Sequence, residues 1–164
     1  VYMRNPVSNY RLAPIDEFGE RTETYTWMSR VNRHFQHQFG DFFLNANHIA
    51  TYHVGKTWGG YEAFEAGKTD PAVLDITCDQ GLDAVAGFFE LNGERYLALV
   101  NNSWTDSGLF KIHTPKDGRL DRMNWNGTFT AVKAAHWDAF YTETEDANIG
   151  GDWLAPGQMK VYRI

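Results

Sequence analysis

Apolar residues between positions 22 and 39 recur at steps of three and four, which is the period of an α-helix. On such a helix they line up as a single stripe that is rich in aromatic rings. The stripe consists of Tyr25, Met28, Val31, Phe35 and Phe39, with Trp27 beside it. The pattern predicts one helix over residues 22–39.

The residues at the two ends of this segment suit helix termini. Thr22 is a candidate N-cap, and Glu23 suits the positive end of the helix dipole. Gly40 stands where a left-handed C-terminal residue belongs, so we expect the helix to end there.

After residue 40 the helical period gives way to short segments of β-forming residues separated by turn residues. The expected strands are 49–54, 73–77, 84–91, 94–100, 109–113, 120–125, 128–133 and 159–164. No strand–helix–strand alternation occurs in this part, which disfavours a parallel sheet. The pattern predicts a mainly β fold: an antiparallel β-sandwich over residues 46–164, with one N-terminal α-helix.

The strongest local signal is Asn92-Gly93 between two apolar segments, 84–91 and 94–100. Both residues of a type I′ turn need a positive φ, and Asn-Gly meets that need best. The sequence therefore predicts a tight β-hairpin here.

Composition narrows the classes of partner. The 164 residues are 43% hydrophobic and 15% aromatic, which is typical of a globular protein with a real core. The net charge of −6 argues against nucleic acid and against an anionic membrane, since both require a basic face. No apolar run reaches the length of a membrane span, and the single Cys78 has no internal disulfide partner.

The aromatic stripe of the predicted helix needs a partner surface. One helix beside a sandwich can bury only one of its sides, so a helix this apolar is expected to pack against another domain.

Several segments resemble the C-terminal region of TIM-barrel glycoside hydrolases of the β-galactosidase type. YMRNP (2–6) resembles the last barrel strand, and IDEFG (15–19), YTW (25–27) and VN (31–32) resemble the approach to the final barrel helix. YHVG (52–55) is similar to the link to the next domain, and YLALVNN (96–102) and LAPGQMKVYRI (154–164) are similar to strands of the β-sandwich that follows such barrels.

The resemblance implies a two-part organisation. Residues 1–45 would be the remnant of the last β/α unit of a barrel, and residues 46–164 the C-terminal sandwich. The implied function is a non-catalytic accessory domain with a structural, interdomain role and sugar contact. The family carries its catalytic carboxyls upstream, so no catalytic residue is assigned. The implied partners are carbohydrate and the upstream barrel of the same polypeptide. Association into a homo-oligomer remains an open alternative.

Two alternative functions belong to other classes of protein. An independent carbohydrate-binding module would show exposed coplanar rings, and a small self-contained hydrolase would need two facing carboxyls in a pocket. Glu143 and Glu145 would point to one face if their segment is extended, but such a pair also suits a solvated edge.

The sequence gives little indication of a metal site or of a catalytic nucleophile. His34 and His37 are three residues apart on the helix without a third ligand nearby, and Cys78 fits a small buried side chain. No cofactor is expected. A cluster of acidic residues allows two interpretations, a structural Ca²⁺ site or simply a solvated loop. The cluster consists of Glu143, Glu145, Asp146 and Asp152.

The candidate carbohydrate-binding residues are aromatic side chains in or beside turn-rich segments. They are Trp58, Tyr61, Trp104 and Trp125. An exposed ring stacks on the C–H face of a sugar while nearby amides bind hydroxyls. The alternative for each ring is packing in the core.

Overall fold

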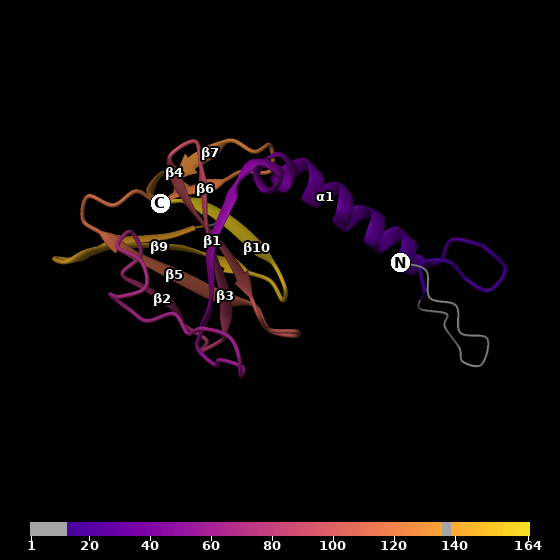
Figure 1. Ribbon diagram of the computed structural model, residues 1–164, viewed down its shortest axis with the longest axis horizontal. Coiled ribbons are helices and arrows are strands. Elements are labelled where there is room, and N and C mark those ends of the chain that lie inside the picture. The colour runs from indigo at the N-terminus through magenta and orange to yellow at the C-terminus, as the bar shows by residue number, and fades with distance from the viewer. Residues whose placement is uncertain (1–12, 136–138) are drawn as a thin grey trace. The chain divides into compact units, whose positions relative to one another are not determined.

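The fold is described from a computed structural model that covers residues 13–135 and 139–164 (Figure 1). The expected strand end at residues 2–6 lies outside these residues. The chain divides into two compact units, Val1–Leu44 and Asn45–Ile164. No described helix is apolar over a stretch long enough to cross a membrane.

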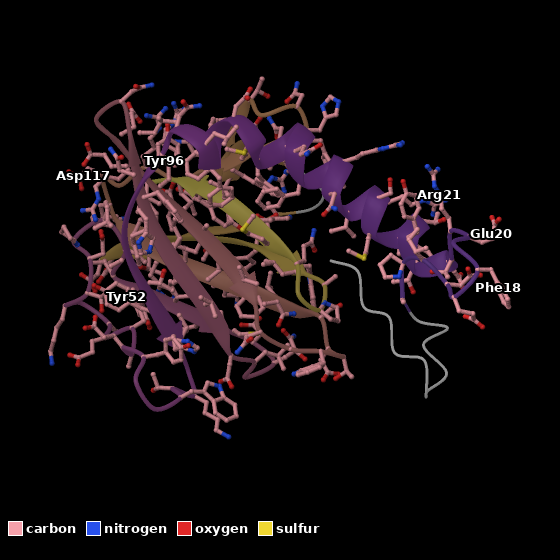
Figure 2. All side chains as sticks on the ribbon, turned by 45° about the vertical axis from the view of Figure 1, so that its right-hand side comes forward. Phe18, Glu20, Arg21, Tyr52, Tyr96 and Asp117 are labelled. Atoms are coloured by element: carbon pink, nitrogen blue, oxygen red, sulfur yellow. The ribbon has the colours of Figure 1, made fainter. Side chains whose placement is uncertain are left out.

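The first unit holds a loop and helix α1, Glu23–Asn45. The loop reverses at Gly19, whose φ is +87°, and Asp16 Oδ1 accepts hydrogen bonds from the backbone N–H groups of Phe18 and Glu20. Figure 2 shows Phe18 and Glu20 projecting from this turn. Thr22 precedes the helix, and its hydroxyl donates to the carbonyl of Ala13.

The expectation that Gly40 ends the helix is wrong. Helix α1 continues to Asn45, and Gly40 does not adopt a positive φ. Ring pairs one helical turn apart support the continuation, with centroids 5.7 Å apart for Phe35–Phe39 and 6.3 Å for Phe39–Phe43. These contacts offset the cost of a glycine within a helix, about 1 kcal/mol.

The second unit is an antiparallel β-sandwich, which confirms the mainly β fold class. One sheet has six strands in the order β1-β3-β4-β10-β6-β7, and the other has four in the order β2-β5-β9-β8. The strands are β1 Asn47–Val54, β2 Asp75–Cys78, β3 Ala84–Leu91, β4 Glu94–Asn101, β5 Gly108–Pro115, β6 Asp121–Met123, β7 Phe129–Ala131, β8 Ala139–Glu143, β9 Ala147–Leu154 and β10 Met159–Arg163. A short 3₁₀ helix, η1 Val132–Ala134, follows β7.

The predicted hairpin is confirmed. Strands β3 and β4 pair from Ala84↔Asn101 to Leu91↔Glu94, and the turn between them has φ of 55° at Asn92 and 78° at Gly93. Positive φ at both residues is the type I′ geometry, whose twist matches that of the flanking strands.

The core lies between the two sheets. It includes the fully buried side chains of Phe88, Leu97 and Leu99 from the larger sheet and of Phe110 and Ile112 from the smaller one. The opposite face of the larger sheet is mixed, since it carries apolar residues together with Thr51, His53 and Arg163. Ala98 and Val161, which are paired neighbours on that face, are also buried.

Candidate functional site

All four predicted carbohydrate-binding side chains are exposed, so the alternative of core packing does not hold for them. The exposed fractions are 57% for Trp58, 66% for Tyr61, 96% for Trp104 and 70% for Trp125.

Three of these rings belong to loops that leave the same end of the sandwich. Val54, Ala84 and Asn101 are aligned across β1, β3 and β4, so the loops next to these residues are neighbours. Asp83 joins them: its Oδ1 accepts from the N–H of Lys56 at 2.9 Å, and its carbonyl accepts from the N–H of Asn102 at 3.0 Å. We call this the aromatic end, defined by Trp58, Tyr61 and Trp104.

The loop that carries Trp104 is held from beneath by Asn101. The side chain of Asn101 is fully buried, and its Nδ2 donates to the carbonyl oxygens of Asp106 at 2.8 Å and Leu154 at 3.1 Å. Its Oδ1 accepts from the N–H of Ser103 at 2.9 Å. The indole of Trp104, the most exposed aromatic ring among residues 13–135 and 139–164, therefore stands on a loop whose backbone is held on both sides by the Asn101 side chain.

Trp58 and Tyr61 share one turn after β1. The N–H of Tyr61 donates to the carbonyl of Trp58 at 3.1 Å. The ammonium of Lys56 lies 4.7 Å from the Trp58 ring centroid, and the Tyr61 ring lies 5.1 Å from that of His53. Each ring thus has one side contacted by a neighbour, while most of its surface stays exposed.

Trp125 is separate from the aromatic end. It lies in the turn between β6 and β7, and β7 is the outer strand of the larger sheet opposite β1. The Asn124 side chain braces this turn by donating to the hydroxyls of Thr128 and Thr130. The structure therefore does not bring Trp125 together with Trp58 and Tyr61.

A further exposed indole, Trp153, escaped the sequence interpretation. It is 54% exposed on β9, between the fully buried Asp152 and Leu154. Strand alternation points its side chain to the outer face of the smaller sheet. The alternation of residues 152–154 could have predicted a strand with Trp153 on its outer face. The strand was not predicted because Gly150 and Gly151, which come just before, are poor strand formers.

The candidate acid pair does not share a pocket. Glu143 ends β8, whereas Glu145 lies in the turn before β9, and both are exposed. Asp152, which the sequence groups with them, is buried in the sandwich.

The other candidate ligands also lie apart. His34 Nε2 is hydrogen-bonded to Gln38 Oε1 at 2.6 Å. No group of three or more His, Cys, Asp or Glu side chains in the described part of the chain is close enough to hold a metal ion. Cys78 is a half-buried free thiol that packs against the core.

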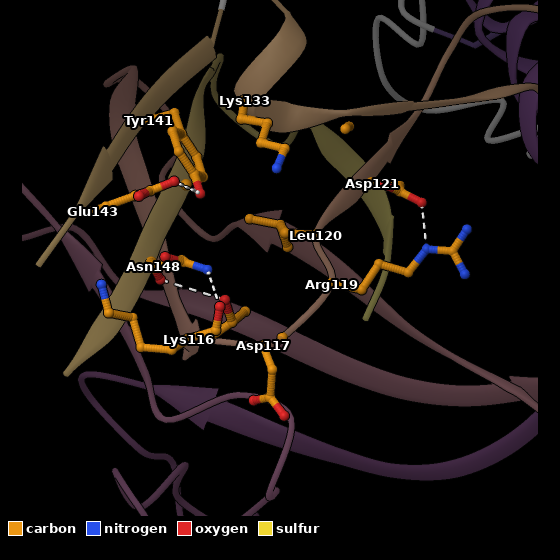
Figure 3. Close-up of a pocket in the computed structure, with 13 residues that line it drawn as sticks. Lys116, Asp117, Arg119, Leu120, Asp121, Lys133, Tyr141, Glu143 and Asn148 are labelled. Atoms are coloured by element: carbon orange, nitrogen blue, oxygen red, sulfur yellow. Dashed lines mark hydrogen bonds and ion pairs between the residues drawn. The ribbon is translucent and has the colours of Figure 1, made fainter. Parts of the chain in front are cut away.

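The opposite end of the sandwich has a hollow of about 510 Å³ (Figure 3). It lies where β5, β8 and β9 meet the loop that leads into β6. Its lining includes Lys116, Asp117, Arg119, Leu120, Asp121, Lys133, Tyr141, Glu143, Asn148 and Gly150. Sequence reasoning missed it because these residues come from four separate segments, each of which is unremarkable by itself.

Two interactions set the electrostatics of the hollow. The Tyr141 hydroxyl donates to Glu143 Oε1 at 3.0 Å, and Arg119 Nε donates to Asp121 Oδ2 at 2.5 Å. Burial, together with the hydrogen bond to Glu143 and the charge of that carboxylate, raises the pKa of Tyr141 above its ordinary value of 10.0. The phenol is therefore a donor at neutral pH.

Comparison of the chain with models of protein families, with curated proteins and with solved structures finds no match. The fold and the two ends of the sandwich are thus the basis for a functional proposal.

Proposed function

We propose that the chain is a non-catalytic accessory part of a glycoside hydrolase, and that its sandwich contacts carbohydrate through the aromatic end. The observation that carries the sugar contact is Trp104, a 96% exposed indole on a loop that the buried Asn101 holds in place. The enzyme class rests on the sequence resemblance.

Exposed rings on a braced loop suit sugar recognition for a physical reason. The apolar C–H face of a pyranose gains from contact with an indole, and a ring that is already fixed loses little entropy on binding. Polar side chains stand beside Trp104, since Asn102, Thr105 and Asp106 are exposed on the same loop. These can bind hydroxyls at the edge of a sugar that is stacked on the ring.

The arrangement of carboxylates supports a non-catalytic role. A glycosidase needs two carboxyl groups facing one bond. Of the three acids that line the hollow, Asp121 is ion-paired with Arg119 and Arg163, and Asp117 is directed away from Glu143 in Figure 3. Glu143 is left without a facing carboxylate among the described residues of this hollow.

The stripe on helix α1 supports an interdomain role. Met28, Val31 and Phe35 are 43%, 65% and 44% exposed. Apolar side chains in one helical stripe are costly to leave in water, about 25 cal/mol per Å². The partner that we propose for this stripe is the upstream catalytic barrel of the same polypeptide.

Binding and turnover assays on the chain test the proposal. We expect retention on a glycan array or in polysaccharide-containing gels, with no release of nitrophenol from nitrophenyl glycosides. Trp104→Ala should weaken retention about fivefold or more, since a ring stacked on an aromatic side chain contributes roughly 1–3 kcal/mol when nucleic-acid bases are the ligand. Trp27→Ala, which removes an exposed indole from the helix, should leave retention unchanged. Turnover, or retention that is indifferent to Trp104→Ala, would refute the proposal.

An independent carbohydrate-binding module is the second candidate, and the aromatic end favours it equally. The two candidates differ at the helix. An independent module has no use for an exposed apolar stripe, whereas an accessory domain needs it for its neighbour. A variant with Val31→Gln and Phe35→Gln separates them, because only the accessory domain should lose association with the catalytic barrel.

A further inference from the structure

We propose that the hollow is a second carbohydrate subsite, which takes a single neutral sugar ring with Lys133, Glu143 and Asn148 as its hydroxyl-binding groups. The hollow lies at the other end of the strands from Trp104. Strand β5 begins at Gly108, paired with Leu154 beside the aromatic end, and finishes at Pro115, paired with Ala147 beside the hollow. This site is argued from its own groups and does not depend on the aromatic end.

The size and position of the hollow suit a small ligand. Its volume of about 510 Å³ lies within the range of roughly 300–1,000 Å³ that is typical of small-molecule sites. The walls come from η1 on one side and from β8 and β9 on the other. In Figure 3 the side chains of Lys133 and Tyr141 reach toward the space beside Leu120.

Both kinds of hydrogen-bonding group face this space. Glu143 is an acceptor that the Tyr141 hydroxyl orients at 3.0 Å. Asn148 is anchored because its Nδ2 donates to the carbonyl of Lys116 at 2.8 Å, which leaves its amide oxygen available as an acceptor. Lys133 is an exposed cation that forms no ion pair with any described residue. A sugar hydroxyl both donates and accepts, so it needs this mixture of partners.

The lining of the hollow includes apolar residues. Leu120 is buried and packs over Gly150, where an added Cβ would lie 2.6 Å from Leu120 Cδ2 and 3.5 Å from the Tyr141 ring. Ala131 completes this surface. A pyranose has polar edges and an apolar face of C–H groups, so it matches polar walls around such apolar residues.

The charge of the lining argues for a neutral ligand. Three cations, Lys116, Arg119 and Lys133, are matched by three anions, Asp117, Asp121 and Glu143. An acidic sugar would gain from Lys133 but would place its carboxylate near Glu143. Hydroxyl groups can use the ammonium and the carboxylate together without this repulsion.

Amide chemical shifts measured during titration of the chain with D-galactose, and separately with D-galacturonate, test the inference. We expect galactose to shift the amides of Gly118, Lys133 and Gly150, with weak, millimolar binding. Glu143→Gln and Lys133→Met should each weaken this binding about tenfold or more, because a hydrogen bond to a charged group contributes roughly 1.5–3 kcal/mol.

Matched controls separate this site from the aromatic end. Glu145→Gln makes the same chemical change two residues away, outside the hollow, and Trp104→Ala alters only the aromatic end; both should leave the galactose titration unchanged. No shift at the three amides, binding of galacturonate alone, or an equal effect of Glu143→Gln and Glu145→Gln would overturn the inference. Failure here would leave retention through Trp104 intact, so the two proposals stand or fall separately.

Discussion

The side chain of Asp152 joins the two layers of the sandwich. Its carboxylate is fully buried on β9 and accepts from Arg122 Nη1 at 2.6 Å, Lys160 Nζ at 2.8 Å and the hydroxyl of Tyr162 at 2.7 Å. The three donors lie on β6 and β10 of the other sheet. Three hydrogen-bond donors compensate the buried charge of the Asp152 carboxylate. Loss of that charge would in turn leave the buried cations Arg122 and Lys160 without a counter-charge.

Asp152→Asn should lower the free energy of unfolding by about 3–5 kcal/mol, because two largely buried cations lose their counter-charge. Urea denaturation measures the change. Asp146→Asn, in the exposed turn before β9, should alter stability by less than about 0.5 kcal/mol. Equal effects of the two substitutions would show that the Asp152 cluster does not hold the sheets together.

The phenol of Tyr162 makes the stability of the fold depend on pH in the alkaline range. Burial, then the negative charge of Asp152 and the hydrogen bond to it, raise the pKa of this phenol well above 10.0. In the unfolded chain the phenol ionises near pH 10, so the stability it contributes is complete below that pH and declines above it. We expect Tyr162→Phe to flatten the fall in stability above pH 10, as measured by urea denaturation along a pH series. An unchanged slope would contradict this assignment.

At the residue scale, the sequence predicted which side chains are exposed better than it predicted which side chains contact one another. The exposure of Trp104 agrees with its place in a turn-rich segment, and Asn101-Asn102 was recognised only as a motif. Asp152 was grouped with Glu145 by proximity along the chain. The structure separates them because alternation turns Asp152 inward, whereas Glu145 stays in the turn.

At the scale of elements, local turn chemistry decided where prediction succeeded. The hairpin β3–β4 was predictable because Asn92-Gly93 leaves few other conformations and both strands alternate cleanly. Strands β8 and β9 were missed because Gly150-Gly151 and a run of acidic residues mask their alternation. Helix α1 passed through Gly40 because contacts among phenylalanine rings outweigh one poor helix former.

Gly93→Ala should destabilise the sandwich by about 1–2 kcal/mol, since a side chain in the left-handed region is strained. Gly59→Ala is its matched control. Gly59 lacks a positive φ, and an added Cβ there meets nothing within 4 Å. Thermal or urea unfolding compares the two, and equal stabilities would contradict the type I′ assignment.

At the scale of the whole molecule, the sandwich has two ends with different chemistry. Braced loops present indoles at the aromatic end, whereas mixed charges and apolar residues line the hollow. The sequence predicted the three rings of the aromatic end but not their grouping, and it did not predict the hollow, because each end gathers segments that are far apart along the chain. The proposed interdomain role depends instead on helix α1, whose apolar stripe was predicted from the helical period of its sequence.

Hydroxyl-radical footprinting of that stripe tests the central claim most directly. The chain alone would be compared with a longer polypeptide that includes the proposed upstream barrel. We predict that Met28 and Phe35 are labelled strongly in the chain alone and are protected in the longer polypeptide, while Trp104 is labelled equally in both. Equal labelling of Met28 and Phe35 in the two polypeptides would contradict the proposal that this helix lies against a catalytic neighbour.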